Sequence, residues 1–188
     1  MKKSGVLTFN DAFKYPFNKA KRMWNILWLF LPIFGWFALG GYSIRIIQEF
    51  TKGKFENLPE MTFGSDMKLG FFMLLKAIPF MVAYVIIVSI LIAISPALDA
   101  VFKILFALFM LPMLSINFMK KMTIESFFEF GVVSAVFDNL GDYVVAVLKS
   151  LALVLIFLVM IIVLVGIPAS MFTKNIFLAD FYRRRVKS

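Results

Sequence analysis

The side chains of this chain most able to do chemistry are its 11 carboxylates. Paired Asp and Glu residues can act as general acid and base or hold a metal ion, and residues 138–142 superficially resemble a calcium-binding loop. That segment lacks the alternating ligands and the distal bidentate Glu of such a loop, so its Asp and Asn residues are expected in turns and helix caps. The chain contains no His and no Cys, which removes the usual acid–base group, metal ligand and thiolate nucleophile. We therefore predict a protein that is not an enzyme, with no catalytic residues, no metal site and no cofactor.

The chain contains four long apolar runs, and these are the elements that must position its polar side chains. Hydrophobic residues make up 62% of the 188 residues, more apolar surface than a soluble domain can bury. A bilayer crossing needs about 20 apolar residues and must be helical, because unpaired amides in hydrocarbon are costly. The third run is short, and it is extended past Lys103, whose long stem can reach the headgroups. The sequence predicts one all-α membrane domain over 1–188, a four-helix bundle with crossings at about 23–44, 77–98, 101–119 and 150–173.

Amphipathic segments are expected to lie along the membrane surface between these crossings. The basic arm 1–22 carries an aromatic stripe that Pro16 interrupts, and the linkers 45–68 and 120–142 each oppose apolar and charged residues. A basic tail, 174–188, follows the last crossing. Ion pairs at i,i+4 spacing are expected in both linkers, between Arg45 and Glu49 and between Lys121 and Glu125.

Basic residues are divided unequally between the two sides of such a bundle. The two termini and the loop with Lys103 carry 12 of the 20 Lys and Arg residues, and the two longer segments between crossings carry the other 8. Because Lys and Arg favour the cytoplasmic side, both termini are predicted in the cytoplasm and both linkers outside. The basic termini are expected to contact anionic lipids of the bilayer, and no nucleic acid partner is expected.

The two halves of the chain are similar in pattern. Leu31-Pro32-Ile33 corresponds to Leu111-Pro112-Met113, and the second crossing of each half is entered through Leu-Lys. This pattern indicates two parallel hairpin repeats. Proline-interrupted helices in matching positions are typical of a transport path, although kinked helices can also simply pack well. The candidate kink, close-approach or pathway positions are Pro32, Gly35, Gly40, Gly41 and Pro112.

Short motifs are spread along nearly the whole chain. Tyr15-Pro16-Phe17, Gly41-Tyr42 with Arg45, Leu58-Pro59-Glu60 and the segment from Ala135 to Tyr143 resemble the uncharacterised membrane family called domain of unknown function 4013. The resemblance implies a multi-pass protein in the cytoplasmic membrane of a bacterium or archaeon, without a known activity. It assigns no role to the motif positions Tyr42, Arg45, Pro59, Asp138 and Tyr143.

Three roles fit a small basic membrane protein of this kind. The first is a non-enzymatic scaffold or accessory subunit that binds lipid, a protein partner or a second copy of itself. The second is a small channel or transporter with a path beside the proline-kinked helices, and the third is an immunity protein against a membrane-active toxin. Ion pathways usually need ionisable groups at mid-membrane depth, and the predicted crossings have none there. The scaffold is therefore the primary hypothesis.

Overall fold

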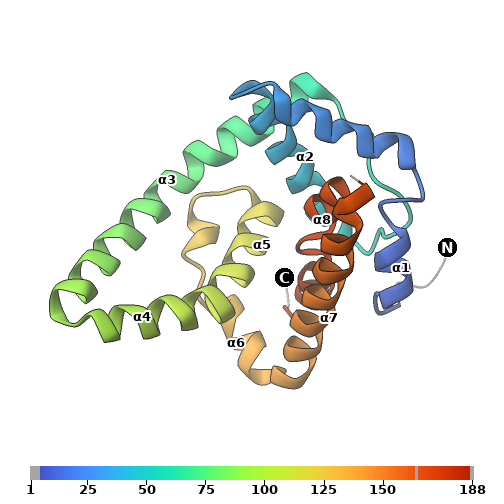
Figure 1. Ribbon diagram of the computed structural model, residues 1–188. Helices are drawn as coiled ribbons and strands as arrows, with labels where there is room; N and C mark the ends of the chain where they lie inside the picture. Colours follow the sequence, from blue (N-terminus) through green and yellow to red (C-terminus); the bar gives the residue numbers. More distant parts are fainter. Residues whose placement is uncertain (1–4, 164, 187–188) are drawn as a thin grey trace.

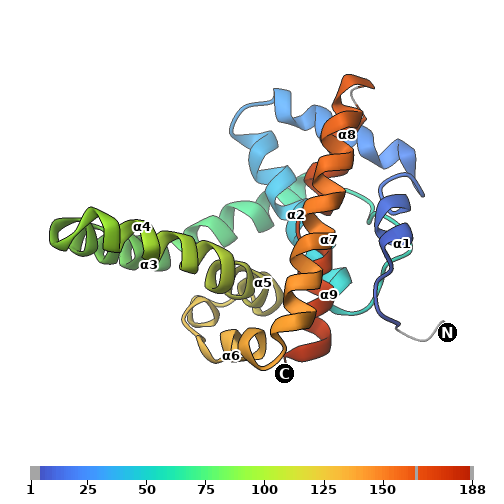
Figure 2. The ribbon, with the colours of Figure 1, turned by 60° about the horizontal axis from the view of Figure 1, so that its bottom comes forward.

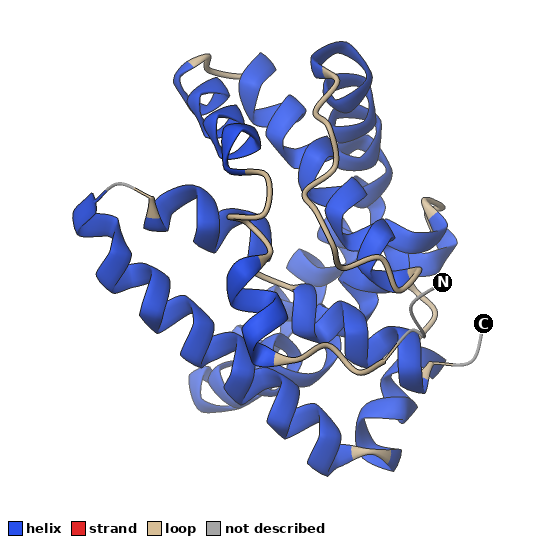
Figure 3. Ribbon diagram, turned by 90° about the vertical axis from the view of Figure 1, so that its right-hand side faces the viewer, coloured by secondary structure: helices blue, strands red, loops and turns tan. Residues whose placement is uncertain are grey.

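The computed structural model describes residues 5–163 and 165–186, and this part of the chain is helical without any strand (Figure 3). This confirms the predicted all-α class. The 3-10 helices are η1, η3 and η4, and η2 is a π-helix. The elements are α1 (Phe9–Lys14), η1 (Ala20–Phe30), α2 (Phe34–Thr51), α3 (Phe63–Ile94), α4 (Pro96–Leu105), η2 (Phe106–Met110), α5 (Leu111–Lys121), η3 (Glu125–Phe127), α6 (Gly131–Asp138), α7 (Leu140–Val159), η4 (Met160–Val163), α8 (Gly166–Thr173) and α9 (Ile176–Arg185).

A helical hairpin projects from the molecule. We call the remainder of the molecule the body. Helix α3 leaves the body, the chain turns at Ser95, and α4 leads back toward α5 (Figures 1 and 2). The Ser95 hydroxyl caps α4 by accepting from the N–H of Leu98, and Pro96 occupies the first turn. In Figure 2 the hairpin extends away to one side, whereas α7 runs through the body at a steep angle to it.

An aromatic stack fills the open end of this hairpin, where it joins the body. The ring of Phe127 in η3 lies 4.3 Å from Phe80 of α3 and 4.1 Å from Phe118 of α5, measured between centroids. Stacked rings bury a large apolar area and have preferred geometries. The segment after α5 therefore holds the two legs of the hairpin at a fixed separation.

Among the described residues, three helical segments are long and apolar enough to cross a membrane: Phe63–Ile94, the continuous run Pro96–Lys121, and Leu140–Ile162. The predicted crossings 77–98 and 101–119 fall on the two legs of the hairpin. The first predicted crossing does not form a segment of this kind, and the fourth coincides only partly with one.

The first predicted crossing, 23–44, consists of two helices that turn back on each other. Helix η1 ends at Phe30, and a γ-turn centred on Ile33 follows, with φ 67° and a hydrogen bond from the N–H of Phe34 to the carbonyl of Pro32. Pro32 has no N–H with which to continue a helix. A Cβ atom on Gly35 would collide with the backbone of Trp28. The predicted kink at Pro32 is thus a reversal of the chain.

The fourth predicted crossing, 150–173, also contains a reversal. Helix α7 ends at Val159, and after η4 the chain returns through α8 and α9, both of which pack against α7. The return is close because Gly166 has no side chain: a Cβ atom there would lie 2.5 Å from the backbone nitrogen of Ile161. Residues 176–182 of α9 are all buried among α2, α5 and α7.

The two halves of the chain pack differently. In the first half α2 packs along α3, whereas in the second half α5 packs against α2, α6 and α9. The structure does not confirm the four-helix bundle or the hairpin repeats. Hydropathy gives the length of an apolar run but not whether the chain crosses or reverses within it.

Candidate functional site

Four of the sequence-predicted positions, Gly41, Tyr42, Arg45 and Pro59, meet where α2 crosses α3. A Cβ atom on Gly41 would lie 2.9 Å from the backbone nitrogen of Gly70 and closer still to the carbonyl oxygen of Asp66. The two helix backbones are thus in direct contact, which only glycine permits. Gly40, predicted beside Gly41 for the same purpose, has no atom within 4 Å of its Cβ position.

Arg45 and Asp66 form a buried bidentate ion pair one helical turn from this contact. The Arg45 Nε and Nη2 atoms lie 2.6 Å and 2.7 Å from the two Asp66 carboxylate oxygens, and the Asp66 side chain is 1% exposed. The N–H of Thr62 donates to the same carboxylate at 2.8 Å. The predicted i,i+4 pair of Arg45 with Glu49 is replaced by this long-range pair, because the buried carboxylate needs a charged partner.

Side chains from α2 and from the basic arm hold the loop between α2 and α3. The Tyr42 hydroxyl donates to the carbonyl of Pro59 at 2.9 Å, and the Asn18 amide donates to the carbonyl of Glu56 at 2.6 Å. Arg22 donates to the carbonyl of Leu58. The arm 1–22 and the linker 45–68, predicted on opposite sides of the membrane, are therefore in direct contact.

Pro112 and Tyr143 are linked through a third residue. In a regular α-helix the N–H of residue 112 would donate to the carbonyl of Leu108, and proline has no N–H. The Tyr143 hydroxyl of α7 donates to that carbonyl. Pro112 is the second residue of α5, which begins directly after the π-helical turn η2, so these two positions join α7 to an irregular part of the hairpin.

The remaining predicted positions lie apart from these contacts. Pro32 is exposed and Gly35 buried at the γ-turn between η1 and α2. Asp138 is an exposed residue at the end of α6. Neither place brings together groups that could act on a substrate.

A buried polar network around Asn117 was missed by the sequence reasoning. The Asn117 amide of α5 donates to the carbonyl of Ser126 at 2.7 Å and to Glu129 at 2.9 Å, and its oxygen accepts from the Tyr182 hydroxyl of α9. Lys121 pairs with Glu129 at 2.5 Å rather than with Glu125. The only sequence signal for this network is an Asn within an otherwise apolar stretch.

Hydrogen bonding and burial set the protonation states of Glu129 and Tyr182 in this network. Hydrogen bonds donated by Lys121, with the larger effect, and by Asn117 lower the pKa of the Glu129 carboxyl below its ordinary value. Burial raises the pKa of Tyr182 to about 12, so its hydroxyl keeps the proton that it donates to Asn117. The linker 120–142 is thereby attached to the C-terminal helix.

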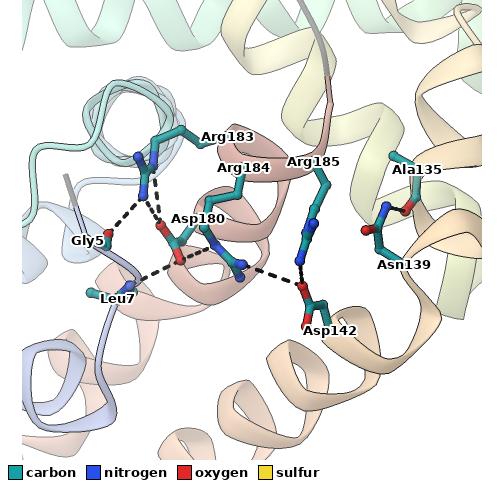
Figure 4. Close-up of polar contacts among 9 residues, drawn as sticks. All are labelled: Gly5, Leu7, Ala135, Asn139, Asp142, Asp180, Arg183, Arg184 and Arg185. Carbon is teal, nitrogen blue, oxygen red and sulfur yellow. Dashed lines mark hydrogen bonds and ion pairs between the residues drawn. The ribbon is translucent and has the colours of Figure 1, made fainter.

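A second buried carboxylate, Asp180, joins the two ends of the described chain (Figure 4). It is 2% exposed and accepts from the N–H of Leu7 at 3.2 Å, from Arg183 at 2.7 Å and from Arg184 at 3.1 Å. Arg183 also donates to the carbonyl of Gly5 at 3.0 Å. Asp180 thus anchors the segment before α1 to α9.

The C-terminal arginines also contact the start of α7. Arg185 pairs with Asp142, and Arg184 lies 3.7 Å from the same carboxylate (Figure 4). The tail 174–188 and the linker 120–142 were predicted on opposite sides of the membrane, and these ion pairs contradict that separation. The physical reason is the reversal after α7, which brings α9 back beside the start of that helix.

The surface of the described part of the body includes a polar hollow and an apolar groove. The hollow, of about 340 Å³, opens between α7, α9 and the segment before α1, and its polar lining residues are Asp142, Lys149, Asp180, Arg184 and Arg185. The groove, of about 650 Å³, lies between η1 and the start of α8, with Trp24, Phe30 and Pro168 among its walls. In the described part of the chain, no three His, Cys, Asp or Glu residues gather as a metal site would require.

Comparison with known proteins gives one match. The model of a family described as "Protein of unknown function (DUF4013)" matches residues 25–166. The matched region includes the α2/α3 crossing and the projecting hairpin, and it ends at the start of α8. No curated protein and no solved structure matches the chain.

Proposed function

We propose, for a chain that belongs to the DUF4013 family of proteins of unknown function, a role as a non-enzymatic scaffold or accessory subunit of a cell membrane. The observation that carries this proposal is the exposed apolar surface of the projecting hairpin. Val85, Ile86, Ile90 and Ile94 of α3 are between 54% and 68% exposed. An apolar surface of this extent needs lipid or a partner protein to cover it.

The charge distribution supports insertion of the hairpin across a membrane. Lys2, Lys3 and Lys187 lie outside the described residues, which leaves 17 of the 20 basic residues. Of these 17, only Lys103 lies between residues 77 and 119, and it pairs with Asp99 at 2.7 Å. The other 16 lie on the body or at the ends of the hairpin legs next to it. Because Lys and Arg favour the cytoplasmic side, we place the body in the cytoplasm and the Ser95 turn outside.

In this arrangement the two legs of the hairpin cross the membrane completely. The reversals after η1 and after α7 return the chain to the side of the body, and the apolar segment Leu140–Ile162 enters the bilayer from that side. Both termini and both linkers then share the cytoplasmic side. The termini therefore stay on the cytoplasmic side expected from the sequence, whereas the linkers, expected outside, are now assigned to the cytoplasmic side as well.

The polar side chains of the body support a role without catalysis. Asp66, Asn117 and Asp180, the buried polar residues described above, each contact at least one other segment of the chain. Their hydrogen-bonding capacity is therefore used to hold the body together. A catalytic group would need a free face toward a substrate.

Site-specific photocrosslinking tests the proposed role of the hairpin. A benzophenone amino acid at Ile86 or Ile90 should give a discrete adduct with one protein in native membranes, because both side chains are more than half exposed. The matched control is the same amino acid at Leu153, which is 1% exposed and should react within its own chain. Adducts with lipid alone at Ile86 and Ile90 would contradict partner binding.

The channel alternative has one structural argument, the π-helical turn η2 two residues before Pro112, since π-turns often occur at functional sites. Ion flux in proteoliposomes that disappears when Pro32 and Pro112 are changed would favour it over the scaffold. Protection of cells on co-expression with a membrane-active toxin would favour the immunity alternative.

A further inference from the structure

The hollow of about 340 Å³ described above lies where the apolar part of α7 meets its charged start. Asp142, Val145, Ala146 and Lys149 follow each other on one face of α7 at helical spacing, and all four line the hollow. Across it lie Arg184 and Arg185 of α9. The hollow therefore has a charged rim on an otherwise apolar helix.

Positive charge exceeds negative charge around this hollow. The two carboxylates are shared among three arginines: Asp180 accepts from Arg183 and Arg184, and Asp142 pairs with Arg184 and Arg185. Lys149 forms no ion pair with any described residue, and its Nζ atom lies 6.0 Å from the ring centroid of Phe177. Arg183 does not line the hollow, so three cationic side chains and two carboxylates line it and leave an excess of one positive charge.

The same helix offers an apolar track beside the charged rim. Ala152, Ile156 and Val159 of α7 are exposed and follow Lys149 at intervals of three and four residues, away from the arginines. A ligand that combines an anionic group with long hydrocarbon chains matches this surface, because its charge would meet the rim and its chains these apolar residues.

We propose that this hollow binds the phosphate group of an anionic phospholipid, with Lys149, Arg184 and Arg185 as donors and the track of Ala152, Ile156 and Val159 as the acyl-chain surface. The inference rests on the proposed membrane insertion. It assigns the lipid to one site, whereas basic residues elsewhere on the body interact with anionic headgroups only as dispersed charges.

Lipid retention in nanodiscs tests the site. The full chain is reconstituted in equal parts of phosphatidylglycerol and phosphatidylcholine, and the lipids that remain bound are measured by native mass spectrometry. The wild-type protein should retain phosphatidylglycerol preferentially. Lys149→Gln should reduce this preference about tenfold, the effect of one lost charge-assisted contact, and Arg185→Gln should reduce it similarly.

The matched control is Lys174→Gln, which removes an exposed lysine of the same tail outside the hollow and should retain the lipid as the wild type does. Equal loss in the Lys174 and Lys149 variants would overturn the assignment to this site. Inorganic phosphate that binds in pure phosphatidylcholine nanodiscs and competes with the lipid would overturn the lipid as ligand. Failure of the protein to enter nanodiscs would instead contradict the proposed membrane insertion, so the two failures are distinguishable.

Discussion

Replacing Gly41 with alanine should lower the free energy of unfolding by about 3 kcal/mol, the upper end of the usual cost of overpacking. The added Cβ would lie 2.9 Å from the backbone nitrogen of Gly70 and closer to the carbonyl of Asp66. These are backbone atoms, so no side-chain rotation relieves the clash and α2 must move away from α3. That movement would also weaken the ion pair between Arg45 and Asp66.

The matched control for this variant is the adjacent residue. A Cβ atom on Gly40 would meet nothing within 4 Å, so Gly40→Ala should be neutral or slightly stabilising through its better helix propensity. Both variants can be compared with the wild type by equilibrium unfolding in mixed micelles, followed by tryptophan fluorescence. Equal stability of the two variants would show that α2 and α3 do not touch at Gly41.

Replacing Arg45 with leucine should be at least as damaging, with a loss of about 3–5 kcal/mol, because it leaves the Asp66 carboxylate buried without a charged partner. The Asp66 side chain is 1% exposed and would keep only the N–H of Thr62 as a donor. The second substitution Asp66→Leu in the same chain should recover part of this stability, since it removes the unpaired charge. The measurement is the same unfolding experiment on the single and double variants.

The control for Arg45 is an exposed ion pair of the same region. Glu60 lies 3.7 Å from Arg22 and its side chain is 85% exposed, so Glu60→Gln should change stability by less than about 0.5 kcal/mol. If Arg45→Leu cost no more than Glu60→Gln, the Arg45–Asp66 pair would not be a buried structural contact.

Helix content could be predicted from the sequence because apolar runs and amphipathic periods are local properties. The reversals at Ile33 and after Val159 could not, because 22 apolar residues fit one crossing as well as two shorter helices that turn back. The glycines that permit the turns, Gly35 and Gly166, are recognised only when the backbone that they approach is known. The sequence therefore predicted the all-α class correctly but not the reversals within the first and fourth apolar runs.

In the candidate site, too, the sequence indicated contacts that are local in the chain but not those between distant residues. The motif positions Gly41, Tyr42 and Arg45 stood out because they lie close together in the sequence. The role of Asp180 depends on Leu7, 173 residues away, and that of Asn117 on Tyr182, 65 residues away. The i,i+4 rule selected Glu49 and Glu125 as partners because it considers a single helix, whereas tertiary packing supplied Asp66 and Glu129.

The central claim is that both termini and both linkers share the cytoplasmic side, with the Ser95 turn outside. The native chain has no cysteine, so single cysteines at Asn57 and Ala97, both exposed positions, can be labelled without background. With a membrane-impermeant maleimide on intact cells, the account predicts labelling at Ala97, and labelling at Asn57 only after permeabilisation. Labelling of Asn57 in intact cells would contradict the account and would restore a linker on the outside.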